Sequence, residues 1–269
     1  MQIQAKNFPV AILGVGTMGE GIAQTLASAG HPVFLYDISE MKIREAVEKI
    51  SGRLEKSVIK GKISNFKRDQ ILKNLLPVKN FSDLSKAKLV IEAIIEDLDT
   101  KQNVFSKMES LISDDVILAT NTSSIDLNNI SMVLKYPQRF LGIHFFNPAP
   151  IMSLVEVVST RQTDQFVVEM VFNLAKKWGK IPVNVFSSPG FIVNRAARPF
   201  YCEALLILKE NVTDCVTCDS IIKECGGFKM GPFELMDLIG LDVNYEVTRQ
   251  MWESYGFHSR FKPSILQRD

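Results

Sequence analysis

Short apolar runs alternate with longer amphipathic stretches over the first 186 residues of the chain. In the runs, β-branched and aliphatic residues follow one another, which is typical of buried strands. In the stretches between them, apolar residues recur every three or four positions, which is typical of helices. This alternation predicts βαβ units and hence a parallel, doubly wound α/β sheet. The expected strands cover residues 10–13, 33–36, 89–93, 116–119, 140–145, 154–158 and 181–186.

Two segments depart from this alternation. Residues 39–76 are Lys-rich with helical apolar spacing and are too many for a simple crossover, so we predict an inserted helical pair that projects from the sheet. After the last expected strand the chain has helical spacing without a strand signal, and Ser188 and Pro189 are the expected N-cap and first residue of a helix. We therefore expect two domains, residues 1–186 with the insertion and an all-α domain at 187–269.

Composition and charge restrict the classes of partner. The 269 residues carry 31 basic and 30 acidic side chains, a formal net charge of +1, and the basic residues are scattered. Binding to nucleic acid or to an anionic membrane surface would need clustered positive charge, so neither is expected. The N-terminus lacks the basic-then-apolar order of a signal peptide, and no apolar run approaches the ~20 residues of a membrane span. We therefore expect a cytoplasmic protein.

The four cysteines, at positions 202, 215, 218 and 225, allow two interpretations. Cys215 and Cys218 form a C-x-x-C pair that could bind a metal or undergo redox chemistry. Cys215, Cys218, Ile222 and Cys225 also recur at three- and four-residue steps, as the core-facing stripe of a helix would. No further ligand stands at a suitable spacing, so we favour reduced packing residues and expect no metal site.

A glycine-rich turn follows the first expected strand. Gly14, Gly16 and Gly19 form a G-x-G-x-x-G motif at the start of an expected helix. The glycines allow a tight turn, a close approach of a phosphate, and close packing of the helix on the strand. Backbone N–H groups at the helix start, which includes Thr17 and Met18, would receive a pyrophosphate. Because strand, glycine spacing and helix occur together, we predict a dinucleotide-binding, Rossmann-type domain rather than a chance glycine turn.

Asp37 indicates which dinucleotide binds. It ends the second apolar run, eighteen residues beyond Gly19, where an acidic side chain can accept hydrogen bonds from the adenine ribose hydroxyls. Its charge would repel a 2′-phosphate, and no arginine follows within six residues, so NAD is favoured over NADP. An enzyme that uses FAD or a nucleotide sugar would share this half of the chain.

Two residues further along are candidates for acid/base chemistry. His144 lies near the end of an expected strand, where ligands of open α/β sheets gather, and Glu156 interrupts the apolar run LVEVV. A carboxylate inside such a run is costly to bury without a partner. If the turn at 148–150 reverses the chain, Glu156 can accept the imidazole N–H of His144, which fixes the tautomer and raises the basicity of the other nitrogen. A satisfied core histidine and an exposed edge-strand glutamate are the structural alternatives.

Several longer strings resemble those of the L-3-hydroxyacyl-CoA dehydrogenase family, in particular its short bacterial 3-hydroxybutyryl-CoA type. They are ILGVGTMGEGIA, TNTSSI at 120–125, HFFNPAPIMSLVEVV from His144, SPGFIVNR ending at Arg195, and MGPFELMDLIGLD from Met230. The resemblance spans nearly all of the chain. It implies an NAD-dependent oxidoreductase that interconverts L-3-hydroxyacyl-CoA and 3-ketoacyl-CoA in fatty-acid β-oxidation or butanoate-type metabolism, and a homodimer formed through the helical domain.

The resemblance also implies roles for individual residues of the reaction centre. His144 matches the family's catalytic base, and Glu156 matches the residue that orients this base. Ser123 matches the hydroxyl that contacts the substrate oxygen beside the cofactor. Asn194 matches an active-site asparagine at the domain junction. The resemblance thus implies a reaction centre that draws residues from both domains.

Other matches concern the cofactor and CoA. Glu96, Lys101 and Asn147 match cofactor contacts on the nicotinamide side, and Lys60 matches a residue that meets the CoA phosphates. Where family chains can have a serine for CoA, this sequence has Arg53, which would replace a hydroxyl contact with a charge contact. Family chains also continue into a Lys- and Gly-rich tail that this sequence lacks, so a truncated chain would miss a cofactor contact and some helical packing.

Two other functions remain open. A related NAD-dependent dehydrogenase of a free hydroxy acid or sugar acid would keep the fold and the His–Glu pair, but it would bind a carboxylate and ignore CoA. A catalytically idle dinucleotide-binding protein would keep the scaffold alone. The complete set of Ser123, His144, Glu156 and Asn194 argues against the idle protein.

Overall fold

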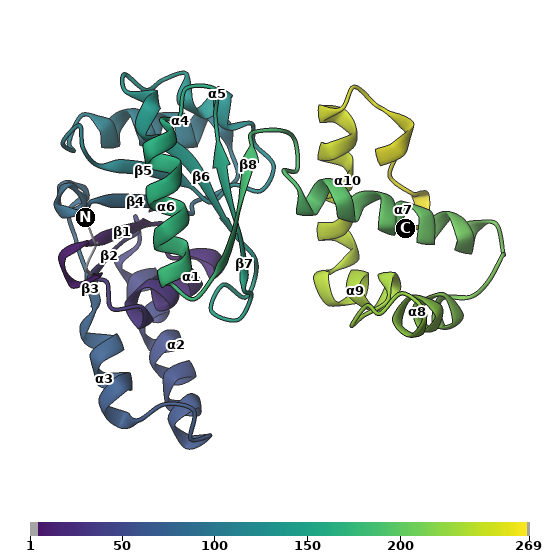
Figure 1. Ribbon diagram of the computed structural model, residues 1–269, viewed down its shortest axis with the longest axis horizontal. Helices are drawn as coiled ribbons and strands as arrows, with labels where there is room; N and C mark the ends of the chain where they lie inside the picture. Colours follow the sequence, from purple (N-terminus) through teal and green to yellow (C-terminus); the bar gives the residue numbers. More distant parts are fainter. Residues whose placement is uncertain (1–4, 268–269) are drawn as a thin grey trace. The chain divides into compact units, whose positions relative to one another are not determined.

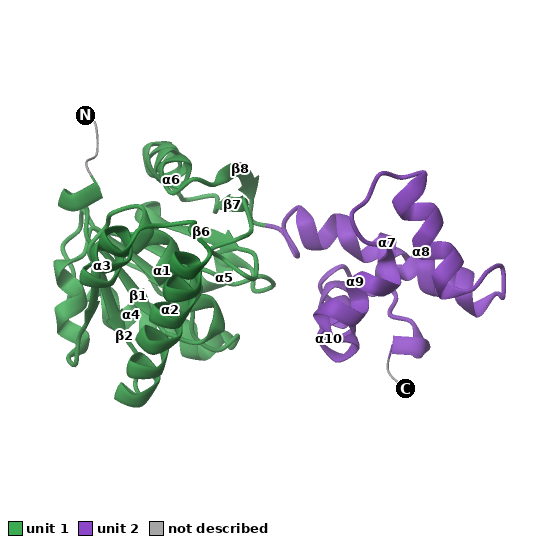
Figure 2. Ribbon diagram, turned by 90° about the horizontal axis from the view of Figure 1, so that it is seen from below, with its two compact units in different colours: residues 1–187 green, residues 188–269 purple. Residues whose placement is uncertain are grey.

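The computed structural model describes residues 5–267. The chain divides into two compact units, Met1–Ser187 and Ser188–Asp269, which have different colours in Figure 2. The first unit holds an eight-stranded sheet flanked by helices, and the second is built from helices (Figure 1). The predicted fold class, an α/β sheet followed by an all-helical part, is confirmed.

The strands of the sheet lie in the order β3-β2-β1-β4-β5-β6-β7-β8. Neighbouring strands are parallel except β6 and β7, which run antiparallel, so the prediction of a parallel sheet is correct for all pairs but one. The order reverses between β1 and β4, and ligands of open α/β sheets bind outside the carboxyl ends of the strands at such a point. The strands are Val10–Leu13 (β1), Val33–Tyr36 (β2), Leu75–Pro77 (β3), Leu89–Glu92 (β4), Ile117–Thr120 (β5), Phe140–Phe145 (β6), Leu154–Ser159 (β7) and Ile181–Phe186 (β8).

The central strands are buried on both faces. Every residue of β1, β4 and β5 is buried, as expected for parallel strands that helices cover on both sides. One core cluster joins Ile12 of β1 to Ile22 of α1 and to Val171 of α6. The packed sheet therefore fixes the positions of the strand ends, from which the loops of the site begin. The covering helices are Thr17–Ser28 (α1), Leu98–Glu109 (α4), Leu127–Ser131 (α5) and Gln165–Lys177 (α6).

The predicted helical insertion consists of Glu40–Ile59 (α2) and Asn65–Lys73 (α3), which extend beyond the strands in the lower part of Figure 1. Ser39 and Ser64 cap these helices through their side chains. The insertion was predicted to reach residue 76, but this is wrong because Leu75–Pro77 form the edge strand β3 beside β2. Three residues give no readable alternation, and Pro77 fits an edge strand because it has no N–H to donate.

The second unit has a small core of Tyr201, Leu205 and Met236. Its elements are Val193–Lys209 (α7), Cys215–Glu224 (α8), Pro232–Ile239 (α9), Leu241–Ser254 (α10), and the 3-10 helices Ser259–Phe261 (η4) and Ile265–Gln267 (η5). The prediction that a helix begins at Ser188 and Pro189 is wrong. Gly190 and Phe191 have φ values of 73° and 50°, and the Phe191 N–H donates to the Ser188 carbonyl oxygen at 2.9 Å. These residues form a turn, and α7 begins after it.

The cysteines of α8 face different environments. Cys218 is buried, Cys215 is half-buried, and Cys225 is exposed at the C-cap, so the prediction of a core-facing stripe is wrong for Cys225. Burial raises the pKa of the Cys215 and Cys218 thiols, which disfavours their thiolate forms. In the described part of the chain, no three His, Cys, Asp or Glu side chains form a group that could hold a metal ion. No helix of that part is long and apolar enough to cross a membrane.

Candidate active site

Two of the three glycines in the turn between β1 and α1 lie against backbone atoms that leave no room for a side chain. Gly14 has a φ of 89°, and a Cβ on it would lie 2.7 Å from the Ala93 carbonyl oxygen. A Cβ on Gly19 would lie 1.9 Å from the Gly14 carbonyl oxygen, so α1 packs directly on the strand end. Gly16 is the N-cap of α1, makes no side-chain cap, and has open space around its Cβ position. The start of α1, which includes Thr17 and Met18, can offer backbone N–H groups to a pyrophosphate.

Asp37 follows β2 and ties that strand to the glycine turn. Its Oδ2 accepts a hydrogen bond from the Val15 N–H at 3.1 Å, and its Oδ1 accepts one from the Ser39 N–H at 3.1 Å. A carboxylate oxygen can accept more than one hydrogen bond, so both oxygens can still take ribose hydroxyls. The neighbouring Ile38 is 95% exposed and offers an apolar surface for a base. The chemistry of this corner fits an adenosine without a 2′-phosphate.

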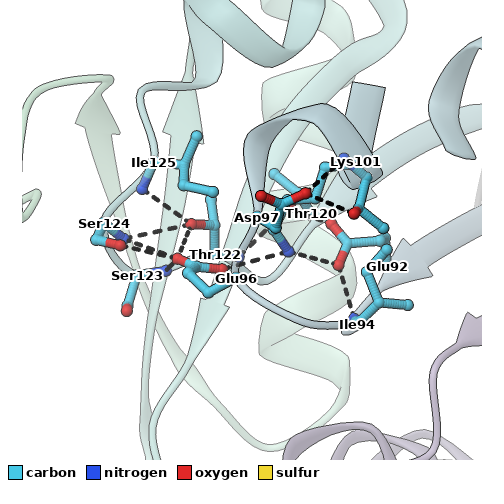
Figure 3. Close-up of polar contacts among 11 residues, drawn as sticks. Glu92, Ile94, Glu96, Asp97, Lys101, Thr120, Thr122, Ser123, Ser124 and Ile125 are labelled. Carbon is cyan, nitrogen blue, oxygen red and sulfur yellow. Dashed lines mark hydrogen bonds and ion pairs between the residues drawn. The ribbon is translucent and has the colours of Figure 1, made fainter. Parts of the chain in front are cut away.

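A buried carboxylate, Glu92, ends β4, where it pairs in the register with Leu13 at the end of β1. Figure 3 shows its polar contacts. Its Oε1 accepts hydrogen bonds from the Lys101 Nζ at 2.6 Å and from the Ile94 N–H at 2.7 Å, and its Oε2 accepts one from the Thr120 Oγ1 at 2.7 Å. Glu92 is fully buried and Lys101 is 1% exposed. Two buried charges are retained only when they are paired and hydrogen-bonded, as these are.

Glu96 lies on the loop between β4 and α4 and connects the buried pair to the loop after β5. Its Oε2 is 3.3 Å from the Lys101 Nζ, and its Oε1 accepts hydrogen bonds from the Thr122 hydroxyl and from the Ser123 N–H at 3.2 Å. The Ser124 N–H and hydroxyl also donate to this oxygen. Burial alone would raise the pKa of Glu96, but the Lys101 ammonium and these hydrogen bonds outweigh it and lower the pKa below its usual value. Glu96 is therefore a carboxylate at neutral pH.

Ser123 lies on the loop after β5, and its side chain points away from Glu96 in Figure 3. Asn121 on this loop accepts the Phe145 N–H at 2.9 Å through its Oδ1, which joins the loop to the end of β6. The loops after β4, β5 and β6 are therefore linked by side-chain hydrogen bonds. Asn147 follows β6 with an exposed side chain.

His144 and Glu156 face each other across the antiparallel pair β6 and β7. They are directly opposite in the register, so their side chains project from the same face of the sheet. The His144 Nδ1 lies 2.6 Å from the Glu156 Oε2, and both residues are buried. Since the carboxylate accepts a hydrogen bond, Nδ1 carries the proton and Nε2 is the basic nitrogen of the neutral ring. The reversal of the chain at 148–150, on which the predicted contact depended, is present.

The residues expected to meet CoA differ in their surroundings. Lys60 is exposed at the C-cap of α2. Arg53, two turns earlier on the same helix, donates to the Glu20 Oε1 at 2.8 Å and to the Gln24 Oε1 at 2.7 Å, both on α1. An arginine held by a carboxylate is less able to attract a phosphate, so this geometry favours Lys60 over Arg53. Asn194 lies in the first turn of α7, in the second unit.

Sequence reasoning missed Glu92, Thr120 and Asn121. The signal that could have identified Glu92 is the acidic residue that closes the otherwise apolar run LVIE. A carboxylate there must have a buried partner, and Lys101 is one turn into the following helix. The partners of Thr120 and Asn121 lie on other strands, so no local pattern announces them.

Two family models match the chain and together cover most of it. The model described as 3-hydroxyacyl-CoA dehydrogenase, NAD binding domain, matches residues 9–188, and the model described as 3-hydroxyacyl-CoA dehydrogenase, C-terminal domain, matches residues 190–269. The predicted NAD-binding domain is confirmed by the first of these matches.

Relatives agree with these matches. A 3-hydroxyadipyl-CoA dehydrogenase of Escherichia coli is 45% identical over 97% of this chain, and the chain spans 55% of that protein. A 3-hydroxybutyryl-CoA dehydrogenase of Clostridioides difficile is 40% identical over 92% of this chain and 88% of its own length. The crystal structure of an (S)-3-hydroxybutyryl-CoA dehydrogenase from Ralstonia eutropha is 34% identical, covers 97% of this chain and 92% of that one, and has a TM-score of 0.93.

Proposed function

Because the chain belongs to the 3-hydroxyacyl-CoA dehydrogenase family, we propose that it interconverts L-3-hydroxyacyl-CoA and 3-ketoacyl-CoA with NAD(H). The observation that carries the proposal is the contact of 2.6 Å between the His144 Nδ1 and the Glu156 Oε2. An oriented, buried imidazole is the acid/base group that this reaction needs, because a hydroxyl proton must leave as the C3 hydride leaves. The contact lies at the end of β6, which is joined through Asn121 to the loop after β5, and that loop donates hydrogen bonds to the cofactor candidate Glu96.

NAD, when bound, accepts the hydride in the oxidation and supplies it in the reduction. In the oxidation, the His144 Nε2 takes the C3 hydroxyl proton, and the ring becomes an imidazolium that the Glu156 carboxylate stabilises through Nδ1. In the reduction, the same nitrogen returns the proton. We assign the holding of the reacting oxygen to Ser123 and Asn194, on the family resemblance. Gly14, Gly16, Gly19 and Asp37 bind the adenosine and pyrophosphate part.

The CoA part is assigned to the helical insertion. Lys60 is exposed at the end of α2, where its ammonium can meet a phosphate. A homodimer formed through the second unit and a cytoplasmic location belong to the same proposal. The homodimer is supported by exposed apolar side chains on the second unit, among them Leu206 and Leu238. Light scattering at micromolar concentration tests it.

The experiment that tests the proposed reaction is an assay of NADH oxidation with several acceptors. These are acetoacetyl-CoA, longer 3-ketoacyl-CoA thioesters, the 3-ketoadipyl thioester and free acetoacetate. Turnover with the thioesters, little with the free acid, and loss of turnover in His144→Gln would support the proposal. Equal kcat/KM for free acetoacetate and its thioester would overturn it in favour of a dehydrogenase of free acids. Binding of NADH without turnover of any acceptor would indicate the idle dinucleotide-binding protein.

A further inference from the structure

The buried carboxylate of Glu92 is the centre from which the loops of the nicotinamide side are held. Its two oxygens accept hydrogen bonds from three segments, namely from Ile94 on its own loop, from Lys101 on α4, and from Thr120 at the end of β5. The Glu92 carbonyl oxygen also accepts the Asn121 N–H at 2.8 Å. A single side chain thus determines where both loops leave the sheet.

Glu92 also belongs to a group of three charged side chains. Glu92 and Glu96 are two acids that share one ammonium, that of Lys101, at 2.6 and 3.3 Å. The three groups therefore sum to one negative charge, and Glu92 and Lys101 are almost fully removed from water. In such surroundings a fixed charge acts over a longer range than in water. The oxidised nicotinamide ring carries a positive charge, and the reduced ring carries none.

We propose that Glu92 is a positioning residue that holds Lys101 and the Ser123 loop in place and, through its charge, favours the oxidised cofactor over the reduced one. This inference rests on the proposed function and takes Glu96 and Lys101 as contacts on the nicotinamide side of the cofactor, as the family resemblance implies. Glu92 accepts hydrogen bonds from Lys101 and Thr120 directly, and it is connected to Glu96 through Lys101. Glu92 ends β4, which lies between β1 and β5 at the point where the strand order reverses.

The test compares Glu92→Gln with Glu92→Asp by measuring the dissociation constants of NAD⁺ and NADH, by calorimetry or fluorescence, without any acyl-CoA. Gln keeps the size and removes the charge, so NAD⁺ affinity should fall about five- to tenfold more than NADH affinity. Asp keeps the charge but is one methylene shorter, so both affinities should fall together and their ratio should stay within about twofold of wild type.

The matched control is Glu109→Gln, at the opposite end of α4. Glu109 is also a nearly buried acid that organises a loop, since its Oε2 accepts the Lys135 N–H at 2.6 Å and its Oε1 accepts the Tyr136 N–H at 2.9 Å. Its replacement should lower thermal stability and leave the ratio of NAD⁺ to NADH affinity unchanged. A purely architectural role for Glu92 would give Glu92→Gln the same result as this control, and that result would overturn the inference.

A further variant covers the case in which Glu92→Gln does not fold. Thr120→Val removes one hydrogen bond to Glu92 and keeps every charge, so both cofactors should bind about three times more weakly. Wild-type affinity for both in a folded Thr120→Val protein would contradict the positioning role. Failure of wild-type protein to bind either cofactor would instead refute the assigned cofactor site, which separates the two ideas.

Discussion

The contact between His144 and Glu156 leads to a quantitative prediction about turnover. The perturbation is Glu156→Gln, which keeps an oxygen that can accept the imidazole N–H but removes the negative charge. The Nδ1–Oε2 distance of 2.6 Å is that of a charge-assisted hydrogen bond. Such bonds contribute about 1.5–3 kcal/mol, against about 1 kcal/mol for neutral ones. The imidazolium formed during oxidation would lose the difference.

A difference of about 1.4 kcal/mol in the barrier corresponds to about tenfold in rate. We therefore expect Glu156→Gln to lower kcat about tenfold and His144→Gln to lower it at least about 10²-fold, as loss of a general base does. Loss of the charge also disfavours the protonated ring, so the pH–rate profile of oxidation in Glu156→Gln should move to lower pH. NADH affinity should be unchanged in both variants, which fluorescence titration checks.

The double variant distinguishes cooperation from independent action. If Glu156 acts only through His144, the double variant should be as slow as His144→Gln alone, because groups that act as a unit are not additive. The assay is NADH formation from NAD⁺ and 3-hydroxybutyryl-CoA, followed under single-turnover conditions to isolate the chemical step. Multiplicative losses in the double variant would refute the reasoning, and so would a near-normal kcat in folded, NADH-binding His144→Gln.

The remaining predictions concern the cofactor, CoA and stability. The kcat/KM for NADH should exceed that for NADPH at least about tenfold, and comparable values in wild type would contradict this. Asp37→Ala should narrow this difference in kcat/KM, because the variant loses both the attraction to the ribose and the repulsion of a 2′-phosphate. Lys60→Ala should raise the KM for acetoacetyl-CoA several-fold, less so at high salt, and should leave the KM for a pantetheine analogue without nucleotide phosphates unchanged. The control Lys42→Ala, at the other end of α2, should change neither KM. An equal rise in KM for both substrates with Lys60→Ala would mean that Lys60 only supports the insertion. His31 accepts the Trp178 indole N–H at Nε2 and donates from Nδ1 to the Phe8 carbonyl oxygen, and burial lowers its pKa below 6.5, so the folded state binds fewer protons than the unfolded one. The contribution of His31 to the free energy of unfolding is therefore present above pH 6.5 and is lost as the pH falls below that value. In urea unfolding below pH 6.5, the free energy of unfolding should fall more steeply with pH in wild type than in His31→Gln, and equal slopes would count against the assignment.

Local patterns determined the larger part of this fold. Seven apolar runs became strands within a residue of their expected ends. For the central strands β1, β4 and β5 the reason is that parallel strands buried on both faces must be largely apolar. The G-x-G-x-x-G spacing predicted the turn at Gly14 and Gly19, because steric contact there admits only glycine. Glu156 was recognisable as a polar interruption of an apolar strand, for which burial requires a partner, and His144 by its place near the end of an expected strand.

Other features depended on contacts that no local pattern contains. The three residues of β3 form a strand only because the edge of β2 is available to them. A left-handed turn at Gly190 and Phe191, whose φ values are 73° and 50°, delays α7 beyond Ser188. Arg53 is held by Glu20 and Gln24 of another helix, and the partners of Glu92 come from three segments. The sequence therefore determined most strands and helices and pointed to His144 and Glu156, because buried strands and amphipathic helices have recognisable periodicities. The tertiary structure alone decided which charges meet, because a partner is selected by the register and packing of elements far apart in the chain.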